Sequence, residues 1–105
     1  MEIRDVRSLA RYDPEKMAKI PVFHSEKMFY DLYALLPGQA QKVHAHEGSD
    51  KVYYVLEGEV VARVGEEEAL LAPGMAVFAP SGVPHGVRNE SASPALLLVV
   101  MAPKP

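Results

Sequence analysis

The stretch GMAVFAPSGVPHGVRN, residues 74–89, joins a short apolar run to a histidine through a turn rich in proline and glycine. The run MAVFA is bounded by a glycine and a proline, as β-strands commonly are. Pro80 and Pro84 stiffen the turn that leads to His85, and a rigid loop positions a ligand with little further loss of entropy. The stretch therefore predicts a strand followed by a loop that presents His85. The alternative is a histidine that only hydrogen-bonds its own turn.

Similar apolar runs recur along the rest of the chain, separated by its nine prolines and seven glycines. They are MFYDLYALL (28–36), VYYVLE (52–57), VVARV (60–64), ALLA (69–72) and ALLLVVMA (95–102). Short runs with a turn signal about every ten residues predict an all-β antiparallel sandwich or barrel. A helix is the competing interpretation of ALLLVVMA, but its β-branched residues and the preceding proline favour a strand.

One helical segment is expected near the N-terminus. Asp13 could cap it, Pro14 suits the first helical position, and Glu15 complements the positive end of the helix dipole. We expect this segment to extend to about residue 18 or 19 and to end before Pro21.

Composition excludes several classes of protein. A length of 105 residues predicts one domain, 1–105, with an N-terminal segment at 1–27 and a core at about 28–102. A net charge of −3 with scattered basic residues argues against a nucleic-acid partner, and no apolar stretch approaches the ~20 residues of a membrane span. The N-terminal sequence lacks an apolar signal region, so we expect a cytoplasmic protein. The absence of cysteine and the scarcity of asparagine and glutamine suggest a heat-adapted source.

A second histidine motif, VHAH, contains His44 and His46. On a strand, residues two apart point to the same face with Cα atoms ~6.6–7 Å apart, so both rings can approach one ion. Two surface histidines are the alternative for this motif taken alone. His24, in PVFHSE, has no comparable context and is interpreted as a structural or surface residue. Without cysteine, any metal must bind imidazole nitrogen, carboxylate, amide or water.

The two histidine motifs together resemble those of the cupin family over nearly all of residues 28–102. Residues 74–89 follow the family's second motif, which is Gly, five residues, Pro-x-Gly, two residues, His, three residues and Asn. The first motif begins at Gly38, contains the His-x-His pair and closes at Gly58. The resemblance implies a small β-barrel or double-stranded β-helix of the jelly-roll type. It also implies that the metal ligands are His44, His46 and His85.

The chain departs from the family pattern at the acidic metal ligand of the first motif. Counting back six residues from Gly58 places this ligand at Lys51, whereas the shorter spacing places it at Asp50 and leaves seven residues before Gly58. A protonated lysine has no lone pair to donate and repels a cation. Three options follow: a three-histidine site with open positions, a carboxylate from Asp50 or Glu47 that bends in, or a weak or absent metal. Lys51 itself could pair with a carboxylate, attract an anionic substrate or remain solvated. Tyr53 shares its strand face and is a candidate pocket residue, and Arg88 is a second, weaker candidate.

Two functions fit these residues. The first is a metal-dependent enzyme that acts on a small polar molecule, with dioxygenase-like or isomerase-like chemistry at one divalent transition metal, Zn, Fe, Ni, Mn or Cu. The second is a non-catalytic module that binds or senses a small ligand, with a structural or recognition metal. Residues 51–57 are apolar on both faces, so a second surface must be covered. The N-terminal segment, another sheet or a second subunit could cover it, and we expect a homodimer.

Overall fold

The computed structural model describes residues 1–105, and nearly all of its regular structure is β-strand. The only helical element is a 3₁₀ turn, η1 (Arg7–Leu9). The strands are β1 (Ala18–His24), β2 (Phe29–Leu35), β3 (Ala40–His44), β4 (Asp50–Glu57), β5 (Val60–Val64), β6 (Glu67–Leu71), β7 (Ala76–Ala79), β8 (His85–Arg88) and β9 (Ala95–Ala102). The all-β fold class predicted from the sequence is confirmed. No helix in the structure has the length and apolar character that crossing a bilayer requires.

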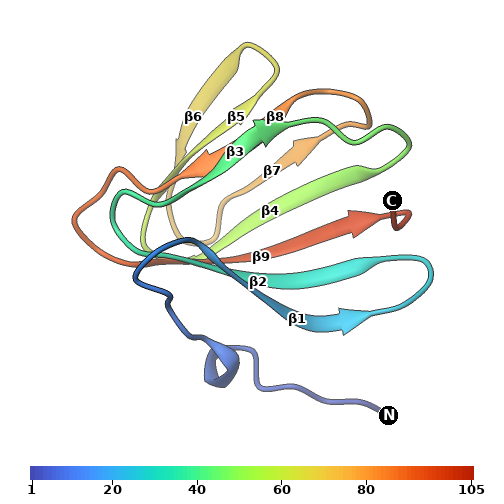
Figure 1. Ribbon diagram of the computed structural model, residues 1–105, viewed down its shortest axis with the longest axis horizontal. Helices are drawn as coiled ribbons and strands as arrows, with labels where there is room; N and C mark the ends of the chain where they lie inside the picture. Colours follow the sequence, from blue (N-terminus) through green and yellow to red (C-terminus); the bar gives the residue numbers. More distant parts are fainter.

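The strands form two antiparallel sheets that pack against each other (Figure 1). One sheet has the order β1-β2-β9-β4-β7 and the other the order β3-β8-β5-β6. Strands that are distant in sequence are neighbours in both sheets, since β9 lies between β2 and β4, and β8 lies between β3 and β5. The chain therefore crosses repeatedly between the sheets, which is the arrangement of a double-stranded β-helix.

The interior between the sheets is built by alternating side chains, as the period of two in a strand requires. On β4, Lys51, Tyr53 and Val55 are buried and their neighbours are more exposed, so the shared face predicted for these residues is confirmed. The interior cluster draws on both sheets and consists of Tyr33, Leu35, Tyr53, Val55, Val60, Ala62, Leu71, Val87, Ala95, Leu97 and Val99.

A second apolar cluster lies on the outer face of the five-stranded sheet. Its buried members are Ile20, Val22, Leu32, Ala34 and Leu96. Val6, Leu9 and Ala10 of the N-terminal segment pack against it, and Arg7 forms an ion pair with Glu57 at the end of β4. The N-terminal segment therefore covers part of this face.

The helix predicted from Asp13 to about residue 19 is wrong. The Asp13 side chain does accept a hydrogen bond from the Glu15 backbone at 2.9 Å, as a capping residue would. The chain then bends and enters β1 at Ala18 instead of continuing as a helix. A helix of about six residues is marginal without tertiary packing, and antiparallel pairing with β2 supplies more backbone hydrogen bonds.

Three strands were not among the apolar runs expected to form strands, and each has a physical reason. β1 contains Pro21, which an edge strand tolerates because its outer side needs no hydrogen-bond donor. β3 has few apolar residues and is interrupted by a bulge. β8 follows the Pro-Gly turn immediately, so His85 is the first residue of a strand and not a loop residue.

Candidate metal centre

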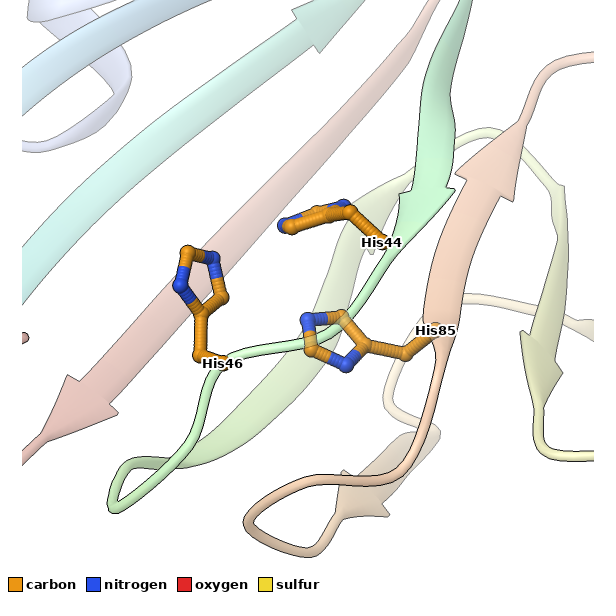
Figure 2. Close-up of side chains that lie close together, drawn as sticks. All are labelled: His44, His46 and His85. Carbon is orange, nitrogen blue, oxygen red and sulfur yellow. The ribbon is translucent and has the colours of Figure 1, made fainter.

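Three histidines meet at one end of the four-stranded sheet (Figure 2). His44 ends β3, His46 lies in the loop that follows, and His85 begins β8 directly opposite His44 in the strand register. The ring centroids are 4.7 Å apart for His44 and His46, 4.6 Å for His44 and His85, and 5.8 Å for His46 and His85. One nitrogen from each ring lies within 4.8 Å of the other two. The side-chain torsions of histidine are soft enough for small ring rotations to bring all three nitrogens onto one ion.

The backbone at this end of the sheet is shaped by a bulge in β3 and by Gly86 in β8. The register of β3 against β8 shifts between Gln41 and His44, so both side chains can face the interior although they are three residues apart. A Cβ atom at Gly86 would lie 2.8 Å from the carbonyl oxygen of Gln41 and 3.1 Å from the backbone nitrogen of Val43. Only glycine allows β8 to approach the bulge this closely.

Hydrogen bonds fix the proton positions on two of the rings. Nδ1 of His44 lies 2.7 Å from the carbonyl oxygen of Lys42, and Nδ1 of His85 lies 2.9 Å from that of Val83. A carbonyl only accepts, so each Nδ1 donates its hydrogen, and each neutral ring keeps the Nε2 lone pair free. His85 therefore does hydrogen-bond its own turn, and that bond prepares its other nitrogen for a ligand.

The Nε2 atom of His85 is the one buried side-chain nitrogen or oxygen without a hydrogen-bond partner in the structure. His85 as a whole is only 1% exposed. An unpaired buried polar atom costs free energy, and such atoms are rare outside functional sites. Three neutral imidazoles, one with this orphaned lone pair, fit a divalent transition metal.

Burial and positive neighbours lower the pKa values of His46 and His85. Burial lowers the pKa of His85, and the charges of Lys51 and the other two histidines lower it further, against the bond to Val83 that raises it. The pKa of His46 is lowered by burial first and then by His44, Lys51 and Lys19. Because a metal binds the unprotonated ring, these effects leave the nitrogens available at neutral pH.

Lys51, at the position of the family's acidic ligand, is buried beside the histidines with 1% exposure. Its ammonium donates a hydrogen bond to Gln41 Oε1 at 3.2 Å and lies over the rings of Tyr33 and Tyr53, at 5.4 and 5.1 Å from their centroids. Burial, with a smaller contribution from Lys19, lowers its pKa from 10.5 to about 8. Lys51 is therefore still charged at neutral pH, and the interpretation as a solvated surface lysine is wrong.

Gln41 connects the polar groups of the interior. Its amide oxygen accepts from the Tyr53 hydroxyl at 2.6 Å as well as from Lys51, and its amide nitrogen donates to the Tyr33 hydroxyl at 3.1 Å. Burial raises the pKa of Tyr33 to about 12 and raises that of Tyr53 as well, so both phenols stay protonated at neutral pH. The structure places Tyr53 at this site, with its ring centroid 6.1 Å from that of His85.

The two carboxylates considered as additional ligands are not in the histidine cluster. Asp50 is exposed and accepts a hydrogen bond from the Ser81 backbone at 2.9 Å, which ties the loop before β4 to the turn before β8. Glu47 is exposed and lies against Gly82 of the same turn. The Asp50 carboxylate therefore helps to hold the start of β4 against the turn that precedes His85.

His24 and Arg88 lie outside the cluster. The Nε2 atom of His24 is 2.5 Å from Asp31 Oδ1. Arg88 forms ion pairs with Glu68 and Glu90, so it is not a pocket residue. Sequence reasoning missed Gln41, because a period of two counted back from His44 passes through Lys42 and places Gln41 on the opposite face. The bulge reverses that assignment.

Comparison with known families finds one match over most of the chain. The family model described as "Cupin domain" matches residues 31–101, which include most of β2, all of β3 to β8 and most of β9.

Two named relatives match parts of the chain. The tetracenomycin polyketide synthase protein TcmJ of Streptomyces glaucescens is 36% identical over 69 residues, which are 66% of this chain and 46% of that protein. An oxalate-binding protein of Thermotoga maritima is 30% identical over 66 residues, 63% of this chain and 54% of that protein. The matched residues span only about half the length of each relative.

Solved structures share the whole fold. The protein TT1209 from Thermus thermophilus is 85% identical, covers 100% of both chains and superposes with a TM-score of 0.98. A predicted oxalate decarboxylase from Thermotoga maritima is 26% identical, with a TM-score of 0.71 over 75% of this chain and 69% of that one. A protein from Klebsiella pneumoniae described as having a double-stranded β-helix domain is 23% identical and has a TM-score of 0.90, over 98% and 90% of the two chains. These likenesses agree with the two-sheet arrangement described above.

Proposed function

The chain belongs to the cupin family, and we propose that it binds one divalent transition metal through His44, His46 and His85 to hold a small polar molecule. The observation that carries this proposal is the free Nε2 of His85, buried and unpaired in a ring whose other nitrogen donates to Val83. A structural histidine at this depth would be expected to use both nitrogens in hydrogen bonds.

The proposed role of each residue follows from its contacts. His44, His46 and His85 would hold the ion, and the carbonyls of Lys42 and Val83 orient two of these rings. When bound, the metal would supply a Lewis acid with positions left open for the ligand, since only three protein ligands are at hand. The buried apolar interior below the site limits the entry of water.

The first candidate for the activity is a metal-dependent enzyme with dioxygenase-like or isomerase-like chemistry. The three-ligand set favours it, because catalytic metal sites keep a position for substrate. The second candidate is non-catalytic binding of a small ligand. The relative named as an oxalate-binding protein supports it, and so do the raised pKa values of Tyr33 and Tyr53, which make both phenols poor proton donors and acceptors near neutral pH.

The metal site is tested by titration of protein made without a histidine tag. Protein stripped with a chelator is titrated calorimetrically with Zn²⁺, Mn²⁺, Ni²⁺ and, under exclusion of oxygen, Fe²⁺. We expect one site per chain, and we expect His85→Ala to weaken binding by about 100-fold or more, because one of three ligands is lost. His46→Ala, at a partly exposed position, should have a comparable effect without opening a cavity in the interior.

His24→Ala is the matched control, since it removes one imidazole that lies outside the cluster. It should leave the metal affinity unchanged. Equal affinities in wild type, His46→Ala and His85→Ala would refute the three-histidine site. Iron or manganese found in the protein as purified would favour oxygen chemistry, and tightly bound zinc would favour a structural or hydrolytic role.

A further inference from the structure

We propose that the Lys51 ammonium, buried beside the three histidines, is the group that binds a carboxylate of a small anionic ligand. The inference rests on the proposed function in one respect: the ligand is the one held at the three-histidine site. Beyond the proposed function, we infer that this ligand is negatively charged and that Lys51 selects it.

The first step of the argument is that Lys51 has no counter-ion. It is 1% exposed, its one hydrogen bond is to the neutral amide oxygen of Gln41, and it belongs to none of the ion pairs in the structure. An ammonium has three hydrogens to donate, so two of them have no protein acceptor. Burying an unpaired charge costs several kcal/mol, so a bound anion would recover free energy that the fold alone does not.

The second step is that the surroundings of Lys51 are positive. Lys19, opposite Tyr33 in the β1–β2 register, places its ammonium 5.7 Å from the centroid of the Tyr33 ring over which Lys51 also lies. The nearest acidic influence is Asp31, which hydrogen-bonds His24 and forms an ion pair with neither lysine. Two ammonium groups therefore lie near one aromatic ring, and the Asp31 carboxylate is already engaged with His24.

Lys51 and the histidine cluster have Tyr53 as a common neighbour. The centroid of the Tyr53 ring is 6.1 Å from that of the His85 ring and 5.1 Å from the Lys51 ammonium. A small molecule with oxygen atoms at both ends would contact the histidine site and Lys51 together.

These steps select the chemical class of the ligand. Its carboxylate would accept hydrogen bonds from the two free N–H groups of Lys51, and a second oxygen would face the histidines. Charge-assisted bonds of this kind are about twice as strong as neutral ones. An acidic residue at position 51, as in the family pattern, would instead repel such a ligand. With lysine at this position, an anion-binding group stands where the family pattern has a metal ligand.

Oxalate and oxamide test this inference as a matched pair of probes, because they have similar shape and differ in charge. Calorimetric titrations are run on wild type and on Lys51→Met, which removes the charge and keeps most of the side-chain length. Each protein is tested metal-free and metal-loaded. We expect oxalate to bind more tightly than oxamide to wild type, and Lys51→Met to weaken oxalate binding by about tenfold or more in both states.

Three further proteins control the experiment. Lys27→Gln removes one exposed positive charge away from the site and should leave oxalate affinity within about twofold. Lys19→Gln, at an exposed position, should weaken oxalate binding by about threefold, and it decides the outcome if Lys51→Met fails to fold. Lys51→Glu restores the acidic residue of the family motif and should strengthen metal binding while oxalate binding is lost.

The inference is overturned if wild type does not distinguish oxalate from oxamide, or if Lys51→Met binds oxalate as wild type does. Elemental analysis of the same samples reports separately on the three-histidine site. Loss of metal binding with retained, Lys51-dependent oxalate binding would contradict the proposed function and leave the anion site standing. The reverse result would contradict the anion site alone.

Discussion

At the scale of single residues, the site contains two buried polar groups that lack a partner of opposite kind. His85 keeps a lone pair without a donor, and Lys51 keeps a positive charge without an anion. Both are almost fully buried, where such groups cost the most free energy. The meeting of the three histidines could be anticipated from the resemblance to the cupin motifs. The sequence left the burial of Lys51 open, although it placed Lys51 on the same strand face as Tyr53. The hydrogen bond from Lys51 to Gln41 could not be anticipated, because it depends on the bulge in β3.

The lowered pKa of Lys51 predicts how stability changes with pH. Its pKa is about 8 in the folded protein and 10.5 as the ordinary value, so between these limits the unfolded chain binds more protons than the folded one. The free energy of unfolding of wild type should therefore rise with pH relative to that of Lys51→Met. Between about pH 7.5 and about pH 9.5 the gain should be about 2 kcal/mol.

Urea unfolding of the two metal-free proteins at both pH values measures this difference. Using the difference between wild type and Lys51→Met cancels the titration of groups that the proteins share. If the difference in free energy of unfolding between the two proteins stays constant over this range, Lys51 does not carry a buried charge in the folded protein.

At the scale of elements, the turn signals and apolar runs predicted six of the nine strands at nearly their observed positions. The remaining strands form through pairing that no local pattern reveals. β1 pairs along the edge of the sheet despite Pro21, and β3 and β8 are held against each other by the bulge and the close approach at Gly86. The helix near Asp13 was mispredicted because its capping signal is genuine, but the segment is too short to compete with β1.

The close approach of β3 and β8 predicts that Gly86 supports the site. Gly86→Ala would place a Cβ 2.8 Å from the backbone of Gln41, so the two strands must separate. We expect a loss of about 2 kcal/mol or more in the free energy of unfolding and weaker metal binding, because His44 and His85 lie on these strands.

Gly38→Ala is the matched control for this substitution. Its backbone φ of 86° makes alanine strained, but an added Cβ meets nothing within 4 Å. It should cost about 1 kcal/mol and leave metal affinity unchanged. Chemical unfolding and metal titration of both variants measure the contrast. Equal effects on metal affinity would show that the β3–β8 contact does not position the histidines.

At the scale of the whole molecule, part of the outer face of the five-stranded sheet stays exposed after the N-terminal segment has covered the rest. Tyr54 on β4 is 38% exposed, and Phe78 on the neighbouring strand β7, which is paired with Val52 of β4, is 54% exposed. Met75, just before β7, is 47% exposed. Large apolar side chains grouped on one face are typical of an interaction surface. We propose that a second copy of the chain covers this face.

Light scattering coupled to size-exclusion chromatography tests the dimer. We expect twice the chain mass of 11.5 kDa for wild type and a shift toward the single-chain mass for Phe78→Asp. Leu70→Asp is the control, because Leu70 is also exposed, at 60%, but lies on β6 of the other sheet. A wild-type mass of 11.5 kDa at high protein concentration would contradict the proposal.

The central claim is that the imidazoles of His44, His46 and His85 bind a single ion, and anomalous diffraction tests it most directly. Crystals of the metal-loaded protein would be measured on both sides of the absorption edge of the metal. We predict one strong anomalous peak per chain, with Nε2 of His44, Nε2 of His85 and a ring nitrogen of His46 as its nearest protein atoms. A peak at another position, or no peak in protein whose metal content has been verified, would contradict the account.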